Sequence, residues 1–204
     1  MTDPLAILAR IREAPARPRP GERCDMCGEL VPDEHEHVVT TERRNLMCTC
    51  RGCWLLFTSN AAGGGRYRAV PDRYVSLGPL SGGPGRGDEL QIPVSVAFFF
   101  YNSTLGSVAA FYPSPAGATE SLLPLDAWDR LVADNDLLAT MEPDVEALLV
   151  RRDAGNEEAY LVPIDACYEL VGELRRLWKG FDGGTEAREA MATFFAGLRD
   201  RSTS

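Results

Sequence analysis

The sequence lacks the features of a membrane-spanning or secreted protein. Its longest apolar run, residues 93–101, has the length of a buried strand and falls well short of the about 20 residues that cross a bilayer. The N-terminal segment MTDPLAILARIRE has an acidic residue at position 3 and no small-residue cleavage site, so we expect no signal peptide. We therefore expect a cytoplasmic protein with no membrane span, in which cysteines stay reduced and bind metal instead of forming disulfides.

Positive charge is also scarce. The 204 residues carry 21 Lys and Arg against 30 Asp and Glu, and Lys179 is the one lysine of the chain. Residues 1–70 hold 10 Arg and 9 acidic residues, whereas residues 71–204 hold 11 basic and 21 acidic residues. Phosphate groups would repel the second part, and the first part has no basic excess to compensate. This distribution argues against a nucleic-acid partner.

Catalytic motifs are sparse as well. The chain has two histidines, His35 and His37, and neither lies within motif distance of the carboxylates in its second half, so a Ser-His-Asp arrangement has little support. The glycine run at 63–65 is not followed by Lys and Ser or Thr, as a phosphate-binding loop requires, and we interpret it as a hinge. We assign no catalytic residue on this basis.

One segment offers an alternative enzyme site. Tyr112–Ser121, with the sequence YPSPAGATES, contains two prolines and several hydroxyl groups, and we expect it to be a stiff loop between a strand and a helix. A plain structural connection explains the same composition. If the segment is a site, its polar side chains are Tyr112, Ser114, Thr119 and Glu120.

What the sequence does contain is a concentration of soft metal ligands in one short stretch. Five of the six cysteines and both histidines lie in CDMCGELVPDEHEHVVTTERRNLMCTCRGC. Cys24, Cys27, Cys50 and Cys53 form a C-x2-C-x22-C-x2-C pattern, which is typical of a metal site. Four thiolates close the tetrahedral shell of Zn²⁺, and a closed shell is structural, not catalytic. We predict zinc at these four cysteines, with iron, in a rubredoxin-like or iron–sulfur centre, as the alternative.

Three more residues in this stretch are candidate ligands. Cys48 and Cys50 point the same way if the segment is a strand, so either thiol can reach the metal, and we prefer Cys50 because it completes the second CxxC pair. His35 and His37 also share a face, which permits a second metal or a mixed site with Cys48. The alternative that we favour is a pair of hydrogen-bonded or solvent-facing histidines. Cys167 lies on the apolar stripe of a predicted helix and is expected to be a core thiol.

The order of the predicted elements defines an α+β protein. We expect an N-terminal helix and proline-rich linker at 1–20, a cysteine-rich metal module at 21–68 and an acidic α+β domain at 69–204. A knuckle, a hairpin and a helix carrying the last ligands indicate a treble-clef or zinc-ribbon-like module. In the domain, the order hairpin–helix–hairpin–helix predicts an antiparallel sheet with helices on one face. Asp165 is placed to cap the second of these helices.

Several stretches together are similar to a known family. They are CDMCGELVPDEHEH, CTCRGCWLLF, GGGRYRAVPDR, IPVSVAFFF, AFYPSPAGATESLL, EPDVEALLVRR and YLVPIDACYELVGELRRLWKGFDGGTE. They resemble an uncharacterised bacterial family, a domain of unknown function whose genes often lie in clusters for NiFe uptake hydrogenases. The resemblance implies an accessory role near hydrogenase assembly or electron flow, and it implies no catalytic residue. We expect a non-enzymatic metal-binding protein with a protein partner, the hydrogenase or its maturation machinery. An electron-transfer protein is the alternative.

Overall fold

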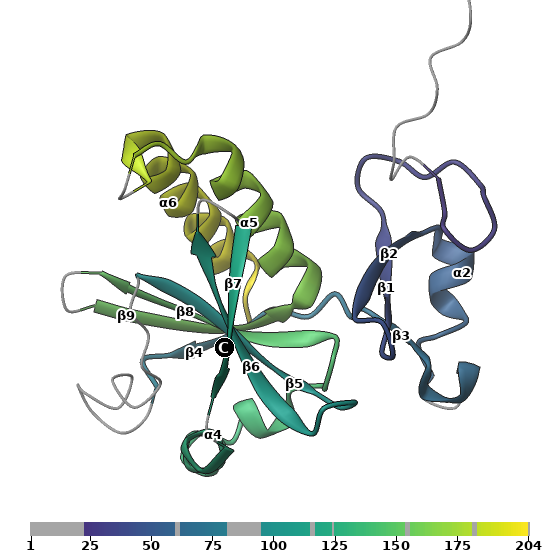
Figure 1. The fold of residues 1–204 in the computed structure, drawn as a ribbon, viewed down its shortest axis with the longest axis horizontal. Helices are drawn as coiled ribbons and strands as arrows, with labels where there is room; N and C mark the ends of the chain where they lie inside the picture. Colours follow the sequence, from purple (N-terminus) through teal and green to yellow (C-terminus); the bar gives the residue numbers. More distant parts are fainter. Residues whose placement is uncertain are drawn as a thin grey trace, which may run out of the picture.

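A computed structural model describes residues 23–59, 62–80, 95–114, 117–123, 125–153, 156–180 and 183–203. These residues form two lobes, each built on its own antiparallel sheet (Figure 1). We call residues 23–70 the cysteine lobe and residues 71–203 the acidic lobe. The helix and linker predicted at 1–20 lie outside the described residues.

The cysteine lobe is organised around a three-stranded sheet with the order β2-β1-β3. Strands β1 (Glu36–Thr40) and β2 (Asn45–Thr49) form a hairpin, and β3 (Tyr67–Ala69) pairs with the other edge of β1. Helix α2 (Arg51–Leu55) follows β2 directly, and the 3-10 turn η1 (Ala62–Gly65) precedes β3. The order of knuckle, hairpin and helix is therefore the order that the sequence predicts for a metal module.

The acidic lobe contains a six-stranded antiparallel sheet with the order β4-β9-β8-β5-β6-β7. The pairs β5–β6, β6–β7 and β8–β9 join strands that are consecutive in the chain. Strand β4 pairs instead with β9 at one edge, and β8 pairs with β5, so that β7 forms the other edge. The sheet and the helices together confirm the α+β class. The strands are β4 (Val75–Gly78), β5 (Val96–Asn102), β6 (Ser107–Ser114), β7 (Gly117–Leu123), β8 (Glu146–Asp153) and β9 (Asn156–Pro163).

Helices cover both faces of this sheet, which differs from the predicted single face. Helices α5 (Ile164–Leu177) and α6 (Gly184–Arg201) pack on one face, whereas α4 (Leu125–Ala133) and the 3-10 turn η2 (Leu138–Thr140) pack on the other (Figure 1). The reason lies in the central strand β5.

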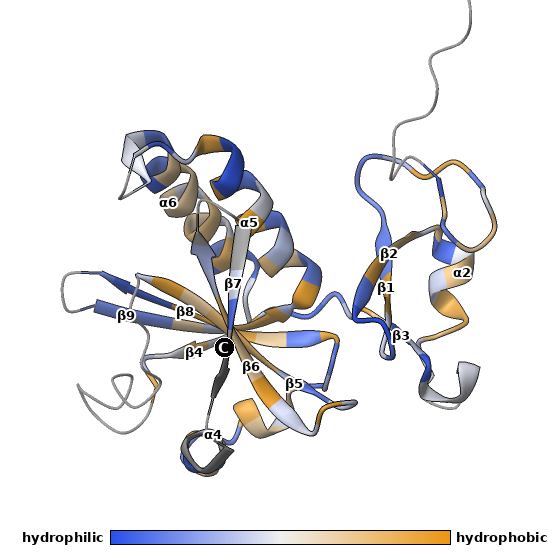
Figure 2. Ribbon diagram, in the orientation of Figure 1, coloured by the Kyte–Doolittle hydropathy of each residue, from blue (hydrophilic) through white to orange (hydrophobic). Residues whose placement is uncertain are grey.

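Residues Val96–Phe100 of β5 are all buried, and successive side chains of a strand point to opposite faces. Phe98 therefore packs with the α5 and α6 side, and Phe99 packs with the α4 side. Because both faces carry bulky apolar side chains, both need a covering layer. Figure 2 shows the hydrophobic residues gathered along the central strands of the sheet.

Most of the segment Tyr112–Ser121 is strand, although the sequence predicts a loop. Strand β6 continues to Ser114 and pairs with β7, in register from Val108↔Leu123 to Ser114↔Gly117. Pro113 of β6 is tolerated because β6 pairs with β5 only as far as Phe111, so Pro113 lies beyond that pairing and near the hairpin end. The order in this half is therefore a three-stranded meander, β5-β6-β7, before α4.

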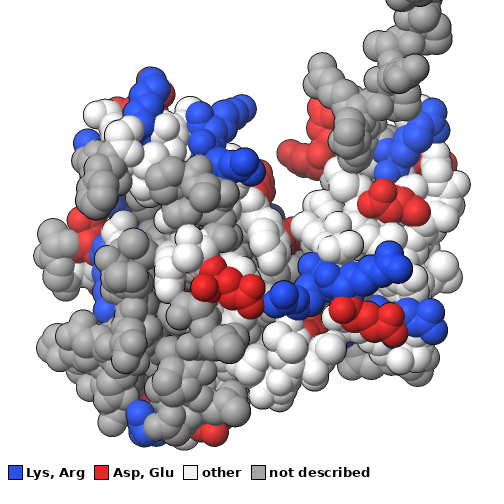
Figure 3. Space-filling view, viewed as in Figure 1, with Lys and Arg blue, Asp and Glu red and all other residues white. Residues whose placement is uncertain are grey.

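The two lobes are held together by apolar packing and by charged side chains. Val39 of β1 belongs to the same buried cluster as α5 and α6, and Leu46 of β2 packs against that cluster. Arg44 pairs with Glu120 at 3.1 Å, and Arg68 pairs with Glu142 at 2.9 Å. Figure 3 shows basic and acidic side chains next to one another where the lobes meet. The cysteine lobe is therefore docked on the acidic lobe by specific contacts.

None of the helices in the described residues is long and apolar enough to cross a membrane.

Candidate metal centre

The first two cysteines lie in a tight turn at the start of the cysteine lobe. The amide of Cys24 donates to the carbonyl of Glu29 at 2.7 Å, and the amide of Gly28 donates to the carbonyl of Cys24 at 2.8 Å. Gly28 has a φ of 77°, a conformation that glycine adopts without the strain of a side chain. This turn is the predicted knuckle, and it presents the thiols of Cys24 and Cys27 together.

The other two cysteines lie at the start of helix α2. Cys50 is the N-cap residue with extended backbone angles, and its carbonyl accepts a hydrogen bond from the amide of Trp54 at 3.0 Å. Cys53 lies three residues later, and residues three apart are neighbours on a helix surface. Because the chain turns from strand to helix at Cys50, its thiol does not lie on a face of the β2 strand and lies instead beside the thiol of Cys53.

The four thiols converge. The sulfur atoms of Cys24, Cys27, Cys50 and Cys53 lie within 4.8 Å of one another, and Sγ of Cys27 is 3.7 Å from Sγ of Cys50. In a tetrahedron with Zn–S bonds of about 2.3 Å, neighbouring sulfurs are about 3.8 Å apart. The arrangement therefore fits four-thiolate coordination, and the same donor set suits iron.

The pKa values of these thiols show that a cation would reduce the repulsion between neighbouring thiolates. Burial raises the pKa of Cys24, but hydrogen bonds from the backbone of Cys50, Cys27 and Met26 outweigh it and lower the pKa to about 6. The pKa of Cys53 is raised to about 12, mainly by burial and then by the neighbouring thiols of Cys27, Cys24 and Cys50. One thiolate thus forms readily, and its neighbours resist a second negative charge beside it. A divalent cation would remove that repulsion.

Cys27 and Cys48 also have raised pKa values, for different reasons. A backbone hydrogen bond at Glu29 lowers the pKa of Cys27, but the thiols of Cys24 and Cys50 raise it by more. For Cys48 the main cause is burial, followed by the negative charges of Asp25 and Cys24.

Cys48 does not join the four-thiol cluster and lies instead with the two histidines. Ligand atoms of His35, His37 and Cys48 lie within 4.8 Å of one another. Cys48 is also tied to the knuckle, because its amide donates to the Asp25 carboxylate and its carbonyl accepts from the Asp25 amide, both at 2.8 Å. The structure thus separates the two thiols that the sequence leaves as alternatives.

Both histidines make hydrogen bonds through Nδ1. Nδ1 of His35 lies 2.8 Å from the carbonyl oxygen of Pro32, and Nδ1 of His37 lies 2.9 Å from Oδ2 of Asp165. Asp165 is in the first turn of α5, in the other lobe. It does not cap the helix, since Pro163 is the N-cap residue, although its Oδ1 accepts from the amide of Ala166.

Asp165 is the residue that sequence reasoning missed in this region. It is separated from His37 by 128 positions, and no local pattern connects the two. The one available signal is the acidic residue itself in the first turn of an otherwise amphipathic helix, and helix stabilisation explains that position equally well.

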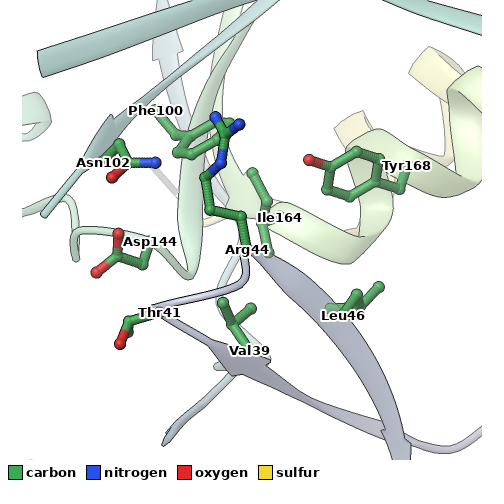
Figure 4. Close-up of a pocket in the computed structure, with 9 residues that line it drawn as sticks. All are labelled: Val39, Thr41, Arg44, Leu46, Phe100, Asn102, Asp144, Ile164 and Tyr168. Atoms are coloured by element: carbon green, nitrogen blue, oxygen red, sulfur yellow. The ribbon is translucent and has the colours of Figure 1, made fainter. Parts of the chain in front are cut away.

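A small cavity lies between the lobes, close to this contact. It is lined by Val39 and Leu46 of the hairpin and by Phe100, Ile164 and Tyr168 of the acidic lobe, with polar side chains at its other side (Figure 4). The polar side chains that line it are Thr41, Arg44, Asn102 and Asp144 (Figure 4). The cavity is a junction of two apolar surfaces, and neither cysteine group lines it.

The residues of the alternative enzyme site are spread over a hairpin. Tyr112 of β6 lies directly opposite Thr119 of β7, so these two share a face of the sheet. Glu120 lies opposite Phe111 and therefore belongs to the other face, where it pairs with Arg44 at 3.1 Å. These side chains therefore lie on two faces of the sheet and do not form one site.

Cys167 lies in the core of the acidic lobe. It is fully buried in the cluster under α5, and burial raises its pKa well above the usual range of a thiol. It takes no part in either group of candidate ligands.

Comparison with known proteins identifies a family. Searches of curated proteins and of solved structures found no match to this chain. A family model matches residues 23–202, which includes both groups of cysteines and histidines and nearly all of both lobes. The chain therefore belongs to DUF5947, a family of unknown function.

Proposed function

We propose that this protein is a non-enzymatic, zinc-stabilised accessory protein that binds a protein partner. The observation that carries the proposal is the convergence of Cys24, Cys27, Cys50 and Cys53 within 4.8 Å. Four thiolates around one ion leave no position for a substrate, so the ion holds a shape. Helix α2 has no buried residue, and a metal at its N-terminal end would supply the anchor that side-chain packing does not.

The cysteine lobe also offers a surface for a partner. Among the described residues, Leu30, Leu55 and Leu56 are large hydrophobic side chains that are 64%, 52% and 61% exposed. Leu55 and Leu56 are adjacent at the end of α2, and neighbouring exposed apolar side chains are typical of interaction sites. Figure 2 shows hydrophobic residues along α2, the helix that contains Cys53. The metal would thus fix the orientation of the residues that meet the partner.

The identity of the partner follows from the resemblance alone. Because the stretches quoted above resemble a family encoded near NiFe uptake hydrogenases, we propose the hydrogenase or its maturation machinery as the partner, in the cytoplasm. A second candidate function is electron transfer, which the four-thiolate donor set favours equally when the ion is iron.

Metal analysis of the full chain, expressed with both zinc and iron supplied, decides between these functions. We expect a colourless protein with zinc bound at the four cysteines and no iron. A red or brown protein with absorption from thiolate-to-iron charge transfer would replace the structural function by the redox one. A chain with neither metal, and with an unchanged fold, would refute both.

Capture of the partner from the native host tests the surface. We expect Leu56→Ser to abolish capture of hydrogenase or maturation proteins and Leu105→Ser to leave it unchanged. Leu105 is a matched control because it is 56% exposed but lies in the β5–β6 turn of the acidic lobe. Equal capture by both variants would exclude α2 as the contact surface.

A further inference from the structure

The cluster of His35, His37 and Cys48 is separate from the four-thiol site and comes from one face of the β1–β2 hairpin. His37 and Cys48 are directly opposite each other in the strand register, so their side chains share a face. His35 directly precedes β1, and its ring centroid lies 4.8 Å from that of His37. The three side chains are partly exposed, and their ligand atoms lie within 4.8 Å of one another.

In each imidazole, Nδ1 makes a hydrogen bond of the kind that is found for histidines in metal sites. A carbonyl or carboxylate oxygen can only accept, so Nδ1 of His35 donates to Pro32 and Nδ1 of His37 donates to Asp165. Each hydrogen bond fixes the tautomer that leaves the Nε2 lone pair available. Histidines that bind metals donate their other nitrogen to a carboxylate or a backbone carbonyl in the same way.

One of these free nitrogens is buried without a partner. Nε2 of His35 has no hydrogen-bond partner among the described residues and is inaccessible to solvent. Leaving a buried polar atom unsatisfied costs about 1–3 kcal/mol, so two histidines that serve only as hydrogen-bonded core residues leave this atom unexplained. A metal ion between the three side chains would satisfy it.

We propose that His35, His37 and Cys48 form a second zinc site that keeps one coordination position open. In a tetrahedron with Zn–N bonds of about 2.0 Å and a Zn–S bond of about 2.3 Å, the ligand atoms are about 3.3–3.6 Å apart, within the observed limit. Two imidazoles and one thiolate suit Zn²⁺, and three protein ligands with a fourth position for water are typical of reactive zinc sites. The inference goes beyond the structural zinc of the four cysteines.

The two histidines of the proposed site face a groove between the lobes. His35 and His37 line this groove together with Asp165, Tyr74 and Arg201. A small ligand in the groove would approach the proposed metal from the side of the two histidines. Because Asp165 belongs to α5, the second site would also connect the cysteine lobe to the acidic lobe.

Zinc stoichiometry of the full chain tests the proposal. We expect two equivalents of zinc in the unaltered protein, one in Cys48→Ser and one in His35→Gln. The Cys50→Ser variant should lose the four-thiolate ion instead, which Co²⁺ substitution distinguishes by its stronger thiolate-to-metal absorption. Cys167→Ser, at a cysteine outside both groups, should retain two equivalents and controls for the loss of any thiol.

Asp165 is a positioning residue in this proposal, and its substitution gives a second readout. We expect Asp165→Asn to weaken binding of the second zinc by about 10–100-fold, the range for second-shell partners, with no change at the first site. Glu169→Gln is the matched control, because Glu169 lines the same groove from the same helix. Azide added to the Co²⁺-loaded protein should change the spectrum of the second site only.

Three outcomes would overturn the proposal. One equivalent of zinc that disappears in Cys50→Ser and persists in Cys48→Ser would leave the structural zinc intact and remove the second site. Absence of all zinc would remove both. A Co²⁺ spectrum that azide does not alter would show that the second site has no open position.

Discussion

Removal of Arg73 should destabilise the protein more than removal of any ordinary surface arginine. Glu146, at the start of β8, is fully buried, and its carboxylate accepts hydrogen bonds from Nε and Nη2 of Arg73 at 2.7 and 2.8 Å. The amide of Glu142 donates to the same carboxylate at 2.7 Å. In Arg73→Ala, a buried carboxylate would lose its cation and two of these three hydrogen bonds.

The magnitude follows from this geometry. Removing one member of a buried ion pair costs about 3–5 kcal/mol, because the remaining charge stays buried without its partner. The Arg73 side chain is 39% exposed, so water can reach part of the vacated space and the lower end of that range applies. We expect a loss of about 3 kcal/mol in the free energy of unfolding. For a chain of this size, that lowers Tm by about 6–12 °C.

Urea unfolding followed by tryptophan fluorescence measures the effect. Arg199→Ala is the control, since Arg199 pairs with Glu158 at 2.9 Å but is itself 51% exposed, so water screens this pair and its loss should cost much less stability than the loss of Arg73. The double variant Arg73→Met with Glu146→Leu should recover most of the lost stability, because it leaves no unpaired charge. If Arg73→Ala and Arg199→Ala lost equal stability, the assignment of Arg73 as the partner of a buried charge would be wrong.

Three further predictions concern the thiols and the metal. A chelator should expose the amides of β1, β2 and β3 to hydrogen exchange while those of β5 and β8 stay protected, because the four-thiol site lies in the cysteine lobe. Equal protection of all these strands after metal loss would contradict a role of the metal in holding the cysteine lobe. Zinc added to metal-free protein in weak buffer should release more protons at pH 5.5 than at pH 7.5. The reason is that Cys24, with a pKa of about 6, is mostly protonated at the lower pH, whereas Cys53, with a pKa of about 12, is protonated at both. Equal proton release at both pH values would refute the lowered pKa of Cys24. Cys167 should resist alkylation at pH 8 until the chain is unfolded, because burial raises its pKa; rapid labelling of the folded protein, read by mass spectrometry, would show that its helix opens.

The local features of the cysteine lobe could be predicted because they depend on neighbours in the chain. The CxxC turn ends at Gly28, whose positive φ a side chain would strain, and the β-branched run at Val38 and Val39 forms a strand. The spacing of the four cysteines likewise predicts that their thiols converge, and in the structure they do. The α+β class follows from the same kind of evidence, alternation and helical periodicity within short windows.

Features that depend on contacts between distant segments could not be predicted. The edge strand β7 forms because residues 117–123 find a partner in β6, and its polar composition resembles that of a loop until that partner is known. Helix α4 covers the second face of the sheet because β5 is apolar on both sides, and sequence periodicity does not say which face a helix will choose.

The sequence by itself determined that this protein has a cluster of soft ligands and which four of them belong to paired motifs. Only the tertiary structure decided how the rest are divided. Cys50 turns into α2 and joins the other three thiols, whereas Cys48 stays in β2, opposite His37. Asp165 then reaches His37 across the two lobes. The division of the two thiols depends on the residue at which β2 ends and α2 begins, and the contact of Asp165 with His37 arises when the two sheets dock. Neither can be read from the spacing of the residues in the chain.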